Sequence, residues 1–341
     1  MKKLLLLLLS AIMLSSVAAP KKKKKKKAAA KVQTELKLYN YNCDHDGSKQ
    51  KALVWFAKGK TPRPLVVALH TWSNNYQGGA AYAKPAMKYN FHVIAPDFRG
   101  KNSIGNPLSM GSDSAVADIV AAVEWMKKRA NVDENKIYLI GGSGGGHMAL
   151  LMAGRHPEIW AAVSVWCPIS DLKKWCEFHK GSGYGRHIIN NLHADPRTDK
   201  AAANEALKRS PVSCLEKAAD VNIDIGAGIN DGHTGSVPID QSLNAYNILA
   251  PEEDRIPQEH IDMLVKQRKA PAGTQKVTDP GYGKRAVIYR KTSKKCRVTI
   301  FAGAHDILTD YSYDWVSRQK KGSPAVWKSG KGTGKAEAIA K

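Results

Sequence analysis

The sequence predicts an α/β fold in which a mostly parallel central sheet carries helices on both faces. Continuous apolar runs such as residues 64–69 are typical of strands that are buried on both sides. Segments with helical periodicity separate these runs, and this alternation favours parallel strands joined by crossover helices. A glycine-rich turn at residues 141–145 joins one apolar run directly to an apolar helix, which is typical of a functional turn at a sheet edge.

The individual elements follow from local patterns. In residues 112–129 apolar side chains recur at helical spacing, and the basic residues at the end suit the negative end of a helix dipole. The apolar runs predict strands at 52–56, 64–69, 91–95, 137–140, 160–166, 221–225 and 297–301. Helical periodicity predicts helices at 112–129, 145–154, 257–268 and 307–319.

Two stretches are longer than connections between strands and helices require. Residues 170–219 and 251–284 both lie between candidate catalytic residues. We therefore expect them to be cleft-side insertions that shape access to the site. The sequence shows no internal repeat and no second domain.

The first residues are typical of an export signal. A short basic start is followed by mostly apolar residues 4–14, and Ala18 closes a small-x-small cleavage pattern. An uncleaved anchor is the alternative, but the apolar stretch is shorter than the roughly 18 residues that a membrane span needs. We expect a secreted or periplasmic protein with a signal peptide at 1–18, a disordered lysine- and alanine-rich tether at 19–37, a catalytic domain at 38–321 and a flexible tail at 322–341.

The chain is strongly basic, with a formal net charge of +23. Ten lysines and no acidic residue lie within residues 1–31, which leaves +13 for the remainder. The run from Lys21 to Lys27 is either a solvated spacer or an electrostatic attachment to polyanions, such as acidic polysaccharide or an anionic envelope. No recognition-helix or base-stacking motif indicates specific nucleic-acid binding, and no later stretch is apolar enough for a transmembrane span.

The five cysteines do not show the spacing of a metal site. An exported protein can form disulfides, although an odd count leaves at least one thiol free. Cys167 and Cys176 flank one predicted loop and are therefore the candidate pair. We expect neither a metal nor a cofactor.

The glycine-rich turn contains the pattern G-x-S-x-G, with Ser143 at its centre. It follows a buried strand and opens an apolar helix, which is the context of a nucleophile elbow. The elbow aims the serine oxygen away from the sheet edge, and the helix N-terminus offers N–H groups to a developing oxyanion. A phosphate-binding loop is the alternative, but the Lys-Ser/Thr of such loops and the glycine spacing of dinucleotide sites are both missing.

A nucleophilic serine needs a base, and the base needs an orienting carboxylate. In strand–elbow–helix enzymes these follow the serine in the order acid, then histidine, each after a strand. Asp231 occupies the loop after strand 221–225, although an Asp before a glycine can also simply form a turn. Asp224 lies inside that strand and Asp240 lies in the next helix, so both are weaker candidates. His305 follows the last predicted strand, and no histidine comes after it.

The oxyanion hole should combine the N–H of Gly144 with one from the loop after strand 64–69. Trp72 is the expected second donor, with Thr71 as the fallback. We expect His70 to support this loop structurally rather than to act in catalysis.

Several motifs together resemble the prolyl oligopeptidase-like branch of α/β-hydrolases, and within it the secreted acetyl xylan and carbohydrate esterases. The resemblance covers roughly residues 38–321 and implies the α/β-hydrolase fold with Ser143, Asp231 and His305 as its catalytic triad. It also implies a structural role for Arg99 below the active site. The sequence departs from the family pattern at Thr71 and Ala304, where glycines are common. The motifs are LHTWS (69–73), PDFRG (96–100), GGSGGGH (141–147), RSP (209–211), DGHTGSVP (231–238) and AGAHD (302–306).

The resemblance also bears on the substrate. Oligopeptidases of this branch carry a large N-terminal propeller, and too few residues precede Ser143 to form one. Aromatic side chains on loops near the site, Tyr76, Trp166 and Trp175, are candidates for binding sugar rings, or else they pack the insertions. We expect a carboxylic ester hydrolase acting on acylated polysaccharide or oligosaccharide. A prolyl oligopeptidase-like serine peptidase is the first alternative, and a non-catalytic polyanion-binding module on the same scaffold is the second.

Overall fold

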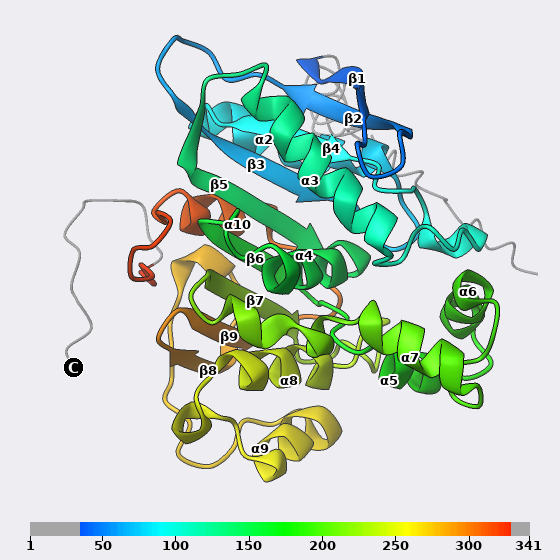
Figure 1. Cartoon of the computed structure of the whole chain (residues 1–341). Coiled ribbons are helices and arrows are strands. Elements are labelled where there is room, and N and C mark those ends of the chain that lie inside the picture. Colours follow the sequence, from blue (N-terminus) through cyan, green and yellow to red (C-terminus); the bar gives the residue numbers. More distant parts are fainter. Residues whose placement is uncertain (1–34, 329–341) are drawn as a thin grey trace, which may run out of the picture.

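Nine strands form one sheet in the part of the chain that the structure describes (Figure 1). This computed structural model describes residues 35–328. The inner strands β4, β3, β5, β6, β7 and β9 run parallel, whereas β1, β2 and β8 pair antiparallel at the two edges. The strands are β1 (Lys37–Asn42), β2 (Lys49–Trp55), β3 (Arg63–Leu69), β4 (His92–Pro96), β5 (Val132–Gly142), β6 (Ala162–Trp166), β7 (Asn222–Gly228), β8 (Val287–Ser293) and β9 (Cys296–Phe301).

Helices cover both faces of this sheet, which confirms the predicted fold class (Figure 1). One face carries α3 (Asp113–Lys127), α4 (Gly144–Arg155) and α8 (Asp240–Leu249), and the other carries α2 (Ala80–Tyr89) and α10 (Thr309–Val316). The start of α3 shows how the sequence sets such boundaries. The side chain of Ser112 accepts a hydrogen bond from the N–H of Ala115, which satisfies a donor that has no partner within the helix.

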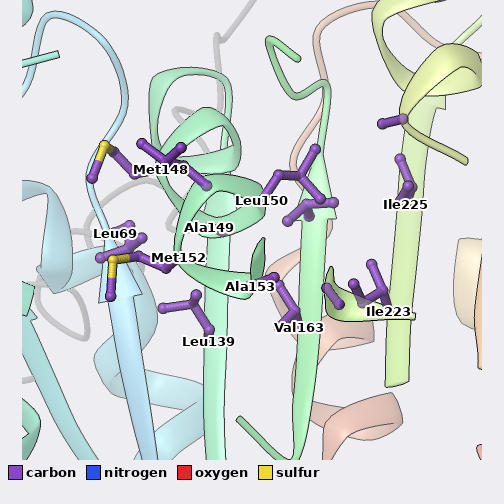
Figure 2. Packing of buried hydrophobic residues seen from close by; sticks show 14 of the residues in the cluster. Leu69, Leu139, Met148, Ala149, Leu150, Met152, Ala153, Val163, Ile223 and Ile225 are labelled. Carbon is purple, nitrogen blue, oxygen red and sulfur yellow. The ribbon is translucent and has the colours of Figure 1, made fainter. Parts of the chain in front are cut away.

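Helix α4 fixes the turn that precedes it, because nearly its whole length is buried. Its alanine and methionine side chains fill the space above the neighbouring strands, as Figure 2 shows for Met148 and Met152 beside Leu69 and Leu139. Small and unbranched side chains let a helix approach a sheet closely on every side. The elbow at its N-terminus is therefore held by a helix that is buried along nearly its whole length.

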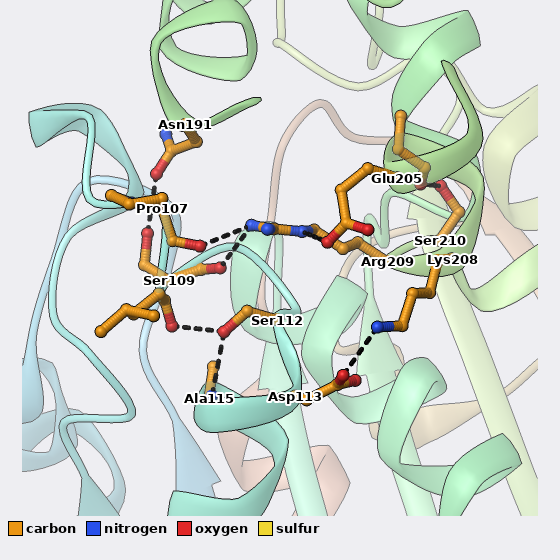
Figure 3. A network of polar contacts seen from close by, with 12 residues as sticks. Pro107, Ser109, Ser112, Asp113, Ala115, Asn191, Glu205, Lys208, Arg209 and Ser210 are labelled. Atoms are coloured by element: carbon orange, nitrogen blue, oxygen red, sulfur yellow. Dashed lines mark hydrogen bonds and ion pairs between the residues drawn. The ribbon is translucent and has the colours of Figure 1, made fainter. Parts of the chain in front are cut away.

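The first insertion folds into α5 (Leu172–Phe178), α6 (Gly183–Leu192) and α7 (Lys200–Lys208), followed by the short turns η3 (Pro211–Ser213) and η4 (Leu215–Ala218). It has a small apolar cluster of its own that includes Trp175 and Ile188. Arg209 ties it to the loop between β4 and α3, because its guanidinium donates to the carbonyls of Pro107 and Ser109 at 2.9 and 3.2 Å (Figure 3). The insertion is thus anchored to the main domain.

The second insertion is largely irregular. The predicted helix at 257–268 is α9 (Gln258–Asp262) continued by the π-helical turn η6 (Met263–Gln267). The remaining short turns are η1 (Tyr76–Gly79), η2 (Asn102–Ile104), η5 (Glu252–Asp254) and η7 (Pro280–Tyr282). No helix within residues 35–328 is long and apolar enough to cross a membrane.

The domain is longer at both ends than the expected 38–321. Leu36 is buried, and β1 begins at Lys37. At the other end, the expectation of a flexible segment from residue 322 is wrong for residues up to 328. The ring of Trp327 stacks on Trp315 with centroids 5.6 Å apart, and its carbonyl accepts a hydrogen bond from Arg297. The predicted signal peptide, nearly all of the tether and the rest of the tail lie outside the described residues.

The candidate pair Cys167 and Cys176 does not form a disulfide. All five cysteines are free and buried. Cys167 follows β6 and lies beside the loop after β9, whereas Cys176 lies in α5 with its sulfur near the carbonyl of Gly185. The two thiols belong to different packing environments, so their closeness in sequence did not indicate a bond.

Candidate active site

Ser143 occupies a strained turn between β5 and α4. Its φ of 56° and ψ of −122° are rare for a residue with a side chain, and such strain is typical of functional turns. The turn is held by two backbone hydrogen bonds. The N–H of Ser143 donates to the carbonyl of Trp166 at 2.8 Å, and its own carbonyl accepts from His147 at 2.9 Å. The residue remains 7% exposed, so the turn leaves part of it open to solvent.

Gly144 lies directly against the loop after β3. A Cβ at this position would be 2.5 Å from the backbone nitrogen of Trp72, so only glycine fits. The N–H groups of Gly144 and Trp72 donate to no acceptor among the described residues. Two neighbouring N–H groups without partners, next to the serine, have the arrangement of an oxyanion hole.

Asp231 and His305 meet because their two loops are hydrogen-bonded to each other. The N–H of Asn230 donates to the carbonyl of Gly303 at 3.0 Å, one residue before Asp231 and two residues before His305. His305 Nδ1 then lies 2.7 Å from Asp231 Oδ2. The structure therefore brings together the acid and the base that the sequence suggested, at the carboxyl ends of the parallel strands, where Ser143 also lies.

The carboxylate of Asp231 is buried and its second oxygen is also occupied. Oδ1 accepts hydrogen bonds from the N–H groups of Gly232 at 3.1 Å and Val237 at 3.0 Å. Gly235 closes over the pair, since a Cβ there would be 2.2 Å from Asp231 Oδ1 and 3.0 Å from the Cβ of His305. The loop after β7 thus wraps the carboxylate and fixes its orientation toward the histidine.

The loop that carries His305 rests on the elbow. A Cβ on Gly142 would be 2.3 Å from Ile307 Cδ1, so these two segments are in close contact. Among the described residues, no hydrogen bond joins Ser143 Oγ to His305. Catalytic hydrogen bonds are often long before substrate binds and tighten in the complex. The side chain of His305 is 25% exposed, which leaves it accessible from the solvent side.

Cys167 is a neighbour of the site that the sequence patterns did not identify. It follows the last residue of β6, the strand beside the elbow strand, with a φ of 47°. Burial and the nearby charge of Asp231 raise the pKa of its thiol well above the usual value. One ligand atom from each of Cys167, Asp231 and His305 lies within 4.8 Å of the other two. Its position directly after a strand that neighbours β5 was the available signal.

The expected aromatic contacts with substrate need correction. Trp166 is 1% exposed, and its indole N–H donates to Ser312 Oγ at 2.7 Å. Trp175 is fully buried, and its indole N–H donates to the carbonyl of Ser236 at 2.8 Å. Both side chains pack the interior and present no ring face to a ligand. Tyr76 is partly exposed at the start of η1, so it alone of the three keeps an accessible side chain.

Two further residues hold the loops around the site. His70 stacks on Phe98 at 3.9 Å between ring centroids, and its Nε2 contacts the carbonyl of Asp97 at 2.9 Å. Arg99 makes two hydrogen bonds to the buried carboxylate of Asp118, at 2.8 and 2.9 Å. Both contacts are structural and lie outside the reacting groups.

Known proteins resemble this chain over part of its length. Residues 81–265, which are more than half of the chain, match the prolyl oligopeptidase family. The acylamino-acid-releasing enzyme of Sus scrofa is 28% identical over 150 residues, which cover 39% of this chain and 20% of that enzyme. A probable acetylxylan esterase A of Neosartorya fischeri is 28% identical over 129 residues, 34% of each protein.

A solved structure shows the same fold. The acylaminoacyl peptidase of Pyrococcus horikoshii superposes with a TM-score of 0.54 and 15% identity, covering 88% of this chain and 43% of that one. The aligned regions span only 20% to 34% of the two curated relatives. The match of residues 81–265, together with the elbow and the acid–histidine pair, shows that the chain belongs to the prolyl oligopeptidase family.

Proposed function

We propose that this protein is a serine hydrolase that cleaves carboxylic esters, and that its substrates are acetylated polysaccharides or oligosaccharides. The observation that carries the proposal is the 2.7 Å contact between Asp231 and His305. This contact lies at the carboxyl ends of the parallel strands, where the elbow places Ser143. The free N–H groups of Gly144 and Trp72 add a binding site for negative charge. These groups together are sufficient for acyl transfer without a cofactor.

The reaction would proceed in two steps. His305 accepts the proton of Ser143 as the serine oxygen attacks the ester carbonyl, and Asp231 holds the imidazole in the required tautomer. The N–H groups of Gly144 and Trp72 donate to the oxyanion that forms. His305 then returns the proton to the leaving alcohol, and water releases the acid from the acyl-enzyme by the same route.

One observation favours an ester of a carbohydrate polymer over a peptide. A probable acetylxylan esterase of Neosartorya fischeri is as similar to this chain, at 28% identity, as the pig peptidase is, so the two relatives do not decide between these substrates. The favouring observation is Tyr76, which lies partly exposed on the loop that carries the oxyanion donor, where a sugar ring can stack. A peptidase remains the second candidate, because the acylamino-acid-releasing enzymes are also relatives.

The location of the protein bears on access to such a substrate. Residues 1–18 are proposed to direct export, which would place the enzyme where polymeric carbohydrate occurs. The lysine run from Lys21 to Lys27 is proposed to hold the enzyme near polyanionic surfaces. Cell fractionation of the full chain, compared with a chain lacking residues 2–18, tests the first of these proposals.

The test of function is a substrate panel of p-nitrophenyl acyl esters, acetylated xylan and peptide anilides. We expect the first two to be cleaved and the Ser143→Ala variant to lose about 10⁴- to 10⁶-fold in turnover. Ser73→Ala, at an exposed serine in the neighbouring loop, is the matched control and should keep wild-type turnover. Cleavage of anilides alone would identify a peptidase. An unchanged Ser143→Ala variant, with binding to polyanions, would instead identify a non-catalytic module.

A further inference from the structure

Cys167 lies beside two residues of the proposed triad, yet the proposed mechanism does not use its thiol. The cysteine is buried after β6, and its sulfur lies near the carbonyl oxygens of Asp306 at 3.7 Å and Ala304 at 4.0 Å. Its sulfur, a carboxylate oxygen of Asp231 and a ring nitrogen of His305 all lie within 4.8 Å of one another. Thiolate, carboxylate and imidazole are the three ligand types that bind zinc in proteins.

We propose that Cys167, Asp231 and His305 form an inhibitory binding site for a soft divalent cation such as Zn²⁺. Atoms with mutual separations of 4.8 Å or less lie within about 2.8 Å of a common point, whereas zinc binds sulfur at about 2.3 Å and nitrogen or oxygen at about 2.0–2.2 Å. Movements of about 0.5–0.8 Å, within the range of side-chain rotations, therefore complete the site. His305 is the exposed member and gives an ion its route of entry.

The charges also balance in the bound state. The thiol releases its proton as the sulfur–zinc bond forms, so a thiolate and the carboxylate of Asp231 contribute two negative charges. These offset the two positive charges of the ion, while His305 binds as a neutral ring. A buried site with no net charge avoids most of the desolvation cost of an unpaired ion. Asp231 Oδ1 keeps its two backbone donors, Gly232 and Val237, because only one carboxylate oxygen is needed.

An ion bound to either ring nitrogen of His305 prevents this histidine from acting as the base. If Nδ1 of His305 binds the ion, the remaining proton of the neutral ring lies on Nε2, which then cannot accept the proton of Ser143. If Nε2 binds the ion, the basic nitrogen itself is blocked. The ion therefore competes with catalysis and takes no part in it. The soft thiolate should select Zn²⁺ and Cd²⁺ over Mg²⁺ and Ca²⁺.

The inference rests on the proposed function only where turnover is the readout, so binding is measured separately. Equilibrium dialysis with ZnCl₂ should give one ion per chain for the full-length protein, and the same for Ser143→Ala, which lacks the nucleophile but keeps all three ligands. Cobalt(II) added to either protein should produce visible absorption bands of a tetrahedral site and a near-ultraviolet sulfur-to-cobalt band. Loss of the sulfur band in Cys167→Ser, but not in Cys176→Ala, would assign the thiol. Cys176 is a matched control, since it is an equally buried free thiol in α5.

Inhibition supplies the second readout, with each variant normalised to its own rate in EDTA. We expect Zn²⁺ to inhibit the wild type reversibly and Cys167→Ala or Cys167→Ser to need at least about tenfold more zinc for the same inhibition. The inference is overturned if zinc does not bind, or if both Cys167 variants bind zinc as tightly as the wild type. If no substrate is cleaved but cobalt still shows the sulfur band, the proposed function fails while the metal site stands.

Discussion

Replacing Asp231 by asparagine should abolish most of the activity while leaving the fold intact. The carboxylate accepts three hydrogen bonds, from Gly232 and Val237 on Oδ1 and from His305 on Oδ2. Asparagine keeps an acceptor for the two backbone N–H groups, but its amide nitrogen donates toward His305. The imidazole must then accept at Nδ1 and carry its proton on Nε2, the tautomer that cannot take the proton of Ser143.

The expected loss follows from that tautomer. A triad with its acid replaced in this way loses about 10⁴-fold in turnover, which corresponds to about 5 kcal/mol in the activation free energy. The free energy of unfolding should change little, because the loop amides keep their acceptor. In Asp231→Ala both amides lose it, and each buried unsatisfied N–H costs about 1–3 kcal/mol. The alanine variant should therefore lose both activity and stability.

Turnover of p-nitrophenyl acetate and urea unfolding measure the two effects separately. The asparagine variant should be about 10⁴-fold slower at wild-type stability, and the alanine variant should unfold at clearly lower urea concentration. Activity of Asp231→Asn within tenfold of the wild type would refute the orienting role of Asp231. Equal stability of the two variants would refute its role in building the loop.

Three other changes test separate parts of the structure. Gly144→Ala places a Cβ 2.5 Å from the backbone nitrogen of Trp72, and turnover should fall by about 10²- to 10³-fold while binding of a substrate analogue persists; unchanged turnover would exclude an oxyanion hole between these residues. Asp224→Ala leaves the buried guanidinium of Arg297 without its partner and should lower the free energy of unfolding in urea by about 3–5 kcal/mol, so a stable variant would contradict the assignment. Burial lowers the pKa of His147 to about 4, below its ordinary 6.5, so the unfolded chain binds a proton that the folded protein does not. The free energy of unfolding should therefore fall by about 3 kcal/mol as the pH drops from 6.5 toward 4, and His147→Gln, which cannot titrate, should remove this part of the pH dependence.

The sequence predicted the elements that are buried on both faces and missed those at the edges. Continuous apolar runs marked the strands from β2 to β7 and β9, because a strand covered by helices needs apolar side chains on both sides. The edge strands β1 and β8 are mostly exposed or half-buried and contain several polar residues, so no apolar run marked them. The helices of the first insertion were also missed, since they pack on a separate small cluster whose partners are distant in sequence.

For the site, position relative to the strands was more informative than residue type. Ser143, Asp231 and His305 were identified because each follows a buried strand, and the ends of parallel strands meet at one edge. Trp166 and Trp175 were chosen for their flat rings, but whether a ring faces solvent depends on packing that no local pattern reports. Their indole groups are buried and each has an internal acceptor, so these two tryptophans support the site from within and do not line it.

Strand β9 has a stabilising ion pair near its start and the proposed catalytic histidine beyond its end, and mutation or proteolysis can affect stability and catalysis separately. Arg297, near its start, pairs with Asp224 and also needs the carbonyl and the ring of Trp327, whereas His305 follows its other end. During synthesis the guanidinium is made thirty residues before the tryptophan that completes its surroundings. We therefore expect the surroundings of Arg297 to be completed only after residue 327 has left the ribosome. Proteolytic cleavage near residue 322 should therefore destabilise the start of β9 first. The end of β9 that precedes His305 should be affected only indirectly, through the packing of the core.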